Sequence, residues 1–161
     1  LEIDQVRYVK ESTGDIRRVH GAFGERLQVV CGAPNVALES LALGCRAWTT
    51  GIMNAVPRSA QQLMRAVSEL EDLEMARRVY YQQILPLVDV MSRNHNPTGT
   101  IKAGVNARGV DVGAPRRPGS AVPPADRVTI KRLMSEVARA EASIAAELAS
   151  RTRRSTEPTG A

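Results

Sequence analysis

The chain has 161 residues, of which 43% are apolar and 24% charged, so it has the size and composition of one globular domain and not of a disordered segment. Its net charge of +5 comes from 19 arginines and three lysines that are scattered along the sequence, which favours solvated surfaces and a basic C-terminal tail over a nucleic-acid interface. Two cysteines and two histidines, far apart, exclude a disulfide framework and a zinc site, and no apolar run reaches the length of a membrane span. We therefore expect no cofactor, no nucleic-acid partner and no membrane partner. The first residues lack the basic start and apolar core of a signal peptide, and we expect a cytoplasmic protein.

The first third of the chain predicts three strand–helix units. Strands are expected near residues 6–10, 27–32 and 47–50, because β-branched and apolar residues are concentrated there. Asp15 is a candidate N-cap for the first helix, which is expected to carry Ile16, Val19 and Phe23 on one face. The turn 32–35 leads into the second helix, which ends at Gly44. Alternating units of this kind predict a parallel sheet covered by helices.

After residue 54 the pattern changes to helices alone. Ser59 and Gln62 have the spacing of a capping box at the start of one helix, and Pro86 is expected to kink the next, over residues 73–91. A short helix over 100–108 and a Gly- and Pro-rich loop over 110–125 precede a final helix that begins at Asp126. The final helix carries a narrow apolar stripe, and we expect the part past Glu141 to protrude or to contact a partner. Residues 151–161 are expected to form a disordered tail.

Lys10 is the strongest candidate for chemistry because it lies at the C-terminal end of a predicted buried parallel strand. Ligands bind at that end of parallel sheets and barrels. Apolar walls disfavour the charged form of an amine, and a neutral amine can attack a carbonyl to form a Schiff base. The alternative is a lysine whose ammonium reaches solvent where the strand ends.

Five segments, in order, resemble motifs of the dihydrodipicolinate synthase / N-acetylneuraminate lyase family. Two of them are the Schiff-base segment Val9-Lys10-Glu11-Ser12-Thr13-Gly14-Asp15 and the strand end Val30-Cys31-Gly32. The other three are Leu43-Gly44-Cys45-Arg46-Ala47-Trp48-Thr49-Thr50 with Asn54, then Leu85-Pro86-Leu87, and then Asn96-Pro97 with Ile101-Lys102. The resemblance extends over residues 1 to about 137.

The resemblance implies an α/β fold, the C-terminal portion of a (β/α)8 TIM barrel that comprises strands six to eight and a helical region. The strand–helix units would occupy residues 1–58, and the last barrel helix and the C-terminal helical region would occupy residues 59–150. Lys10 would be the catalytic lysine that forms an imine with pyruvate or a related 2-oxo acid, in a lyase, aldolase, synthase or dehydratase. Gly32 and Thr49 would supply main-chain contacts to the substrate, and the protein would be a homo-oligomer.

Several departures from the family pattern are equally plain. The first five strands have no counterpart, and with them a Thr-Thr pair that grips the carboxylate and a tyrosine that relays protons. Thr49 and Thr50 replace Ile and Ser, and Ala47 replaces Gly. Two functions therefore stay open: part of a Schiff-base lyase, inactive without the remainder, or a non-catalytic truncated or split half-barrel that associates with another chain. Nucleic-acid binding through arginines is a third, weaker hypothesis.

Overall fold

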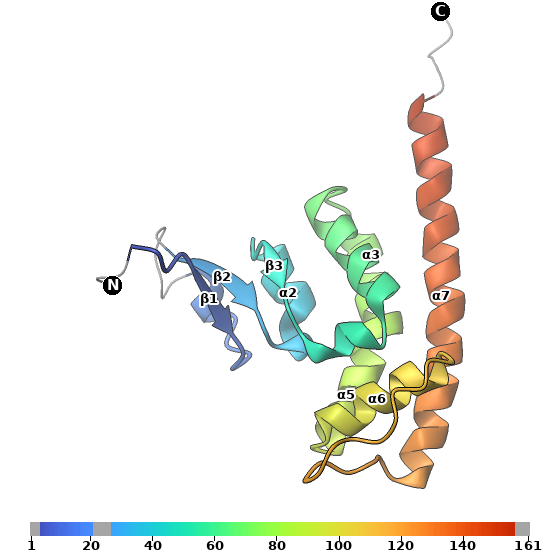
Figure 1. Ribbon diagram of the computed structural model, residues 1–161. Coiled ribbons are helices and arrows are strands. Elements are labelled where there is room, and N and C mark those ends of the chain that lie inside the picture. The colour runs from blue at the N-terminus through green and yellow to red at the C-terminus, as the bar shows by residue number, and fades with distance from the viewer. Residues whose placement is uncertain (1–3, 21–26, 157–161) are drawn as a thin grey trace, which may run out of the picture.

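A three-stranded parallel sheet forms the N-terminal part of the computed structural model, which describes residues 4–20 and 27–156 (Figure 1). The strands are β1 (Tyr8–Glu11), β2 (Gln28–Cys31) and β3 (Ala47–Trp48), in the order β1-β2-β3. Lys10 is in register with Val30, and Val30 with Ala47. The predicted parallel strands and their order are confirmed, although each observed strand is shorter than its predicted range.

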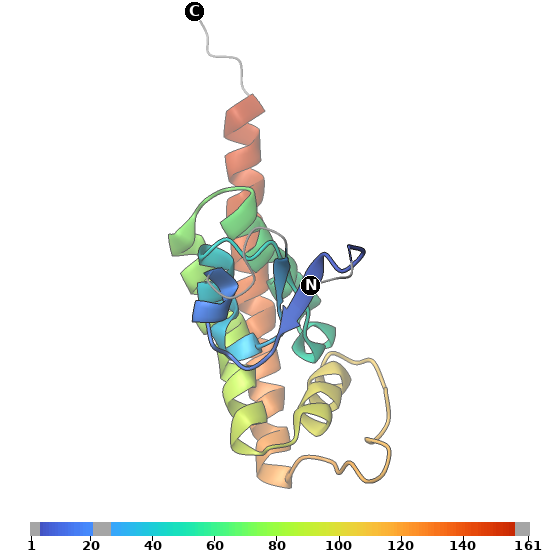
Figure 2. The ribbon, with the colours of Figure 1, turned by 90° about the vertical axis from the view of Figure 1, so that its left-hand side faces the viewer.

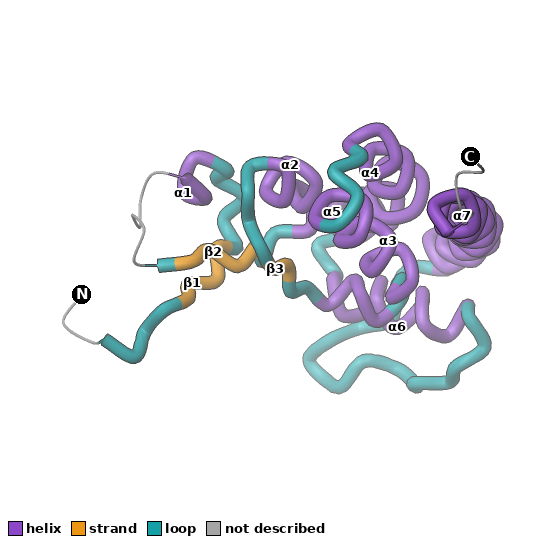
Figure 3. The backbone as a smooth tube through the Cα atoms, turned by 90° about the horizontal axis from the view of Figure 1, so that it is seen from above, coloured by secondary structure: helices purple, strands orange, loops and turns teal. Residues whose placement is uncertain are grey.

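Helices cover only one face of this sheet. Viewed from above, α1 (Arg17–His20) and α2 (Ala37–Ala42) lie on one side of the strands, and no element of the described chain lies on the other (Figure 3). Burial alternates accordingly along β1: Tyr8 and Lys10 are exposed, Val9 is half-buried and Glu11 is buried. Asp15 Oδ1 accepts the Arg17 N–H before α1, whereas the expected continuation of that helix to Phe23 lies outside the described residues.

Apart from the strands, every regular element of the described chain is helical, as the sequence predicts. Its elements are η1 (Pro34–Val36), η2 (Gly51–Asn54), α3 (Pro57–Ser68), α4 (Leu73–Val79), the π-helical η3 (Tyr80–Ile84), α5 (Leu85–Arg93), α6 (Pro97–Ala107) and α7 (Pro124–Thr156). The interruption expected at Pro86 is present, because the π-helical turn ends just before α5, whose first turn contains this proline. No helix in the described part of the chain combines the length and hydropathy that crossing a bilayer requires.

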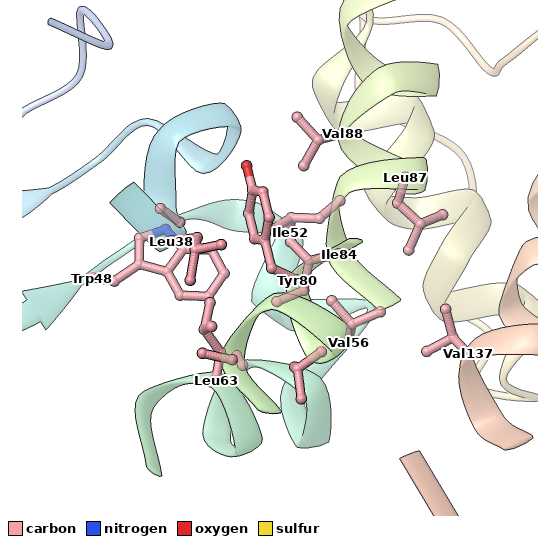
Figure 4. Close-up of a cluster of buried hydrophobic side chains, with 14 of the residues drawn as sticks. Leu38, Trp48, Ile52, Val56, Leu63, Tyr80, Ile84, Leu87, Val88 and Val137 are labelled. Carbon is pink, nitrogen blue, oxygen red and sulfur yellow. The ribbon is translucent and has the colours of Figure 1, made fainter. Parts of the chain in front are cut away.

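The core lies between the sheet's covered face and the helical body. Tyr80, Ile84 and Leu87 point into it from the η3–α5 segment, and Trp48 reaches it from β3 (Figure 4). Val137 contributes from α7 on the far side. The sheet and the helices therefore share one hydrophobic core, which fixes the strand ends relative to the helical body.

The predicted capping box at Ser59 and Gln62 is wrong. Val56 is the N-cap of α3, with no side-chain cap, and both predicted residues instead contact α7. Ser59 Oγ donates to Glu141 Oε1 at 2.8 Å, and Gln62 Nε2 donates to the Glu141 carbonyl at 2.9 Å. A carboxylate about eighty residues away thus replaces the local cap, a partner that no local pattern reveals.

The end of α7 also differs from expectation. Ile144 and Leu148 are buried, and Arg151 NH1 lies 2.6 Å from Asp72 Oδ2 at the start of α4, so the helix stays packed on this chain up to Arg151 and does not protrude from Glu141 onward. The other half of that expectation, contact with a partner, stays a prediction. The helix continues to Thr156, so it extends into the segment 151–161 for which the sequence predicts a disordered tail. The remaining tail residues, 157–161, lie outside the described part. α7 is the longest element of the described chain, and the strands project away from it in Figure 1 and lie in front of it in Figure 2.

The uncovered sheet face leads to a prediction about the chain on its own. Tyr8 is 61% exposed and Val6 38%, beside an outer edge of β1 that pairs with no strand in the described residues. Open edges with exposed apolar side chains promote association. We expect sedimentation velocity to detect concentration-dependent oligomers, which Tyr8→Lys reduces. A sharp, cooperative melt of a monodisperse monomer at every concentration would contradict this expectation.

Candidate functional site

The carboxyl ends of the three strands bring the predicted site residues together. The ladder continues past the strands, since the Gly32 N–H donates to the Glu11 carbonyl at 2.6 Å and the Thr49 N–H to the Cys31 carbonyl at 2.8 Å. Lys10 at the end of β1, Gly32 just after β2 and Thr49 just after β3 therefore lie side by side. Lys10 and Thr49 are both exposed, so this edge of the sheet is accessible in the chain.

Gly32 lies directly against the Lys10 side chain. A Cβ built on Gly32 would come within 2.5 Å of Lys10 Cε and 2.9 Å of Lys10 Cγ, and would also overlap the Ser12 hydroxyl. Real Cβ atoms do not make such contacts. The absence of a side chain at Gly32 thus creates the space in which the Lys10 stem lies.

Glu11 organises the turn that follows Lys10. Its buried carboxylate accepts the Thr13 N–H at 2.7 Å and the Gly14 N–H at 3.2 Å, and it also accepts a short hydrogen bond from the Thr13 hydroxyl. The Thr13 hydroxyl is the main cause that lowers the pKa of Glu11. Gly14, with φ of +80°, completes the turn in a conformation that favours glycine. Glu11 is not a surface carboxylate, because its side chain faces the covered side of the sheet.

Tyr80 positions the chain that follows Gly32, a role that the sequence did not reveal. Its hydroxyl donates to the Pro34 carbonyl at 2.9 Å, and its ring is buried in the core. Burial raises the pKa of Tyr80 well above its usual range, so the phenol stays protonated as a donor. The η3 segment thereby holds the start of η1, two residues after Gly32. The sequence indicates only, from the apolar spacing, that Tyr80 lies in the core.

The remaining nucleophiles and bases lie elsewhere. Cys45 Sγ donates to the Val29 carbonyl at 2.9 Å, and burial raises the pKa of this thiol, so it is not an activated nucleophile. Lys102 lies on α6 and donates to the carbonyls of Val112 and Ala114, away from the strand ends. Within the described ranges, no group of three or more His, Cys, Asp or Glu side chains could hold a metal ion.

The contact between Gly32 and Lys10 gives a mutational prediction. Gly32→Ala forces the Lys10 stem or the Ser12 hydroxyl to move. In a barrel completed with the five missing strands we therefore expect imine formation at Lys10 to fall by at least about tenfold, while the melting temperature changes little. Borohydride trapping with pyruvate measures the first quantity and circular dichroism the second. Gly44→Ala is the control for glycine replacement at a turn, because no atom lies within 4 Å of a Cβ there, although its φ of +96° adds strain. Equal trapping by Gly32→Ala and the parent would show that the contact has no role.

Comparison with known proteins gives a consistent set of relatives. The model of the Dihydrodipicolinate synthetase family matches residues 1–137. The chain is 31% identical over 120 residues to the 4-hydroxy-tetrahydrodipicolinate synthase of an Exiguobacterium species, covering 73% of this chain and 40% of that protein. It is 28% identical over 116 residues to the 5-dehydro-4-deoxyglucarate dehydratase of Pseudomonas putida, covering 68% and 38%.

A solved structure supports the same relationship. A Pseudomonas aeruginosa protein assigned as a dihydrodipicolinate synthetase superposes with a TM-score of 0.76 at 40% identity, covering 84% of this chain and 47% of that one. The chain thus spans less than half the length of each of these relatives.

Proposed function

Because the chain belongs to the dihydrodipicolinate synthetase family, we propose that it carries the Schiff-base lysine of a lyase or aldolase that acts on pyruvate or a related 2-oxo acid. In this proposal the Lys10 amine attacks the keto carbon, a carbon–nitrogen double bond forms and the keto oxygen leaves as water. The main chain at Gly32 and Thr49 contacts the substrate. The imine then serves as the electron sink for cleavage, condensation or dehydration at the neighbouring carbon.

One observation carries the proposal: the Lys10 side chain lies against Gly32 at the carboxyl ends of parallel strands. This end of a parallel barrel is where such folds place their chemistry. Lys10 is exposed in the chain, however, and water reaches its side chain. The rest of a barrel would cover the bare face, exclude water from Lys10 and supply groups that hold the carboxylate and move protons.

We assign β1, β2 and β3 to the sixth, seventh and eighth strands of the barrel, with residues 1–58 forming its last strand–helix units and residues 59–150 the last barrel helix and a helical region. In this proposal the chemistry requires five further strands that complete the barrel. The helical region is the expected contact surface of a homo-oligomer.

Both cysteines are free and buried, which fits the reducing cytoplasm.

A second candidate function has its own supporting observation. The exposed Tyr8 and the unpaired outer edge of β1 suit a split half-barrel that associates with another chain without catalysing a reaction. The two candidates differ in what happens when the remaining strands of the barrel are supplied. A lyase then forms the imine, whereas the non-catalytic half gains only stability.

The decisive experiment supplies those strands. The chain is fused behind the N-terminal part of the Pseudomonas aeruginosa relative, incubated with pyruvate, reduced with borohydride and mapped by peptide mass spectrometry. The expected result is a single adduct on Lys10. A folded fusion with no adduct would favour the non-catalytic alternative, and an adduct on Lys102 would overturn the assignment of Lys10. The 161-residue chain without the fusion should trap pyruvate weakly or not at all.

A further inference from the structure

A cavity away from the strand ends lies between α6, α7 and the segment 108–123 that joins them. Its volume is about 610 Å³, within the usual range for small-molecule sites. Small apolar residues form much of its lining, among them Gly99, Ala103, Ala107 and Val122. In Figures 2 and 3 the joining segment arches away from the two helices.

The arch is held in place at both ends. Lys102 Nζ on α6 donates to the Val112 carbonyl at 2.7 Å and the Ala114 carbonyl at 3.1 Å, and the Val112 N–H donates to Asn106 Oδ1 at 2.9 Å. At the other end Asn96 Nδ2 donates to the Ser120 carbonyl at 2.9 Å. Connections of this length without regular structure are uncommon in compact domains, and ordered examples are usually functional.

Three cations line this cavity against one carboxylate. Lys102, Arg127 and Lys131 are the cations, and Asp111 is the acid, whose Oδ1 accepts the Gly113 N–H. Arg127 and Lys131 lie one turn apart on α7, and neither has an ion-pair partner within the described residues. An ammonium has three donors, and the arch uses two of those on Lys102. The cavity therefore has excess positive charge and unused donors.

We propose that this cavity binds a small organic anion of metabolite size, with at least two acidic oxygens held by Arg127 and Lys131 and a third contact to Lys102. Guanidinium and ammonium donors suit carboxylate and phosphate oxygens, and the small residues of the lining leave room for the body of the ligand. Asp111 favours a ligand that also carries a donor, such as a hydroxyl group. The site is independent of Lys10 and of the reaction proposed above.

Calorimetry with citrate, inorganic phosphate and glycerol on the 161-residue chain tests the proposal. We expect citrate to bind saturably, more tightly than phosphate, and to weaken as salt is added, while glycerol gives no heat of binding. Hydrogen exchange measured by mass spectrometry should slow over residues 108–123 when citrate is present. Saturable binding of phosphate but not of citrate would show a site for a simple anion and not for a ligand with several acidic groups, and would overturn the proposal.

A pair of charge-matched variants separates a defined site from general attraction to a basic surface. Arg127→Glu should weaken citrate binding by at least about tenfold. Arg139→Glu makes the same charge change on an exposed residue of α7 outside the cavity, and it should leave the affinity within about twofold. Equal losses in the two variants, or no saturable binding to the parent chain up to millimolar citrate, would overturn the proposal. Circular dichroism melts show whether each variant is folded.

Discussion

We expect Lys10→Arg to abolish imine formation in a barrel completed with the five missing strands, and turnover to fall to background. Arginine keeps a positive charge and a similar apolar stem at the end of β1, so the packing against Gly32 is disturbed little. Its guanidinium has no neutral amine to attack a carbonyl, and no carbon–nitrogen double bond to pyruvate can form. The loss is a change in chemistry and not in fold, and borohydride trapping together with a kinetic assay measures it directly.

The other two lysines provide matched controls. Lys102 lies on α6 and donates to two loop carbonyls, and Lys131 is exposed on α7. Both lysines are away from the strand ends. Lys102→Arg and Lys131→Arg should retain trapping within about twofold, because neither side chain contacts the region of Lys10. Residual trapping in Lys10→Arg, with the adduct on another lysine, would show that position at the strand end is not what selects the reactive amine.

The sequence predicts the sheet well and the helical contacts less well. β-branched and apolar residues at 27–31 and 47–50 identify parallel strands because such strands carry their own local signal. The pairing of Ser59 and Gln62 with α7 carries none, since a Ser-x-x-Gln spacing has the same local pattern whether it caps a helix or reaches a distant carboxylate. That this chain itself covers Ile144 and Leu148 was not predicted for a related reason: an apolar stripe shows which face of a helix is buried but not which element covers it.

Some features of the candidate site could likewise be predicted from the sequence, and others could not. Position in the strand order is enough to place Lys10, Gly32 and Thr49 at one edge. The sequence does not reveal that Glu11 is a buried acceptor for the turn, because its identity as a charged residue favours the surface. Nor does it reveal that the Tyr80 hydroxyl holds the start of η1, since this contact joins segments 46 residues apart.

The buried ion pair between Arg108 and Glu141 is where we expect the largest effect on stability. Glu141 is 3% exposed, and both its carboxylate oxygens accept from the Arg108 guanidinium, at 2.8 and 3.1 Å. Arg108 Nε donates to the Ala55 carbonyl at 2.5 Å, and the Ser59 N–H donates to Glu141 Oε1 at 3.1 Å. One carboxylate thus joins the start of α3, the end of α6 and the middle of α7.

Glu141→Gln should lower the free energy of unfolding by about 3 kcal/mol or more, because the amide keeps the shape but leaves Arg108 as a largely buried charge without a counter-ion. Denaturant unfolding followed by far-ultraviolet circular dichroism measures the change. Glu136→Gln is the control: it makes the same substitution on α7 in a solvent-exposed pair with Arg132, and it should cost less than about 1 kcal/mol. Arg108→Met combined with Glu141→Leu removes both charges, so part of the lost stability should return. If the free energy of unfolding of the double variant is lower than that of Glu141→Gln, as two independent losses would add, then Arg108 and Glu141 do not act as a pair.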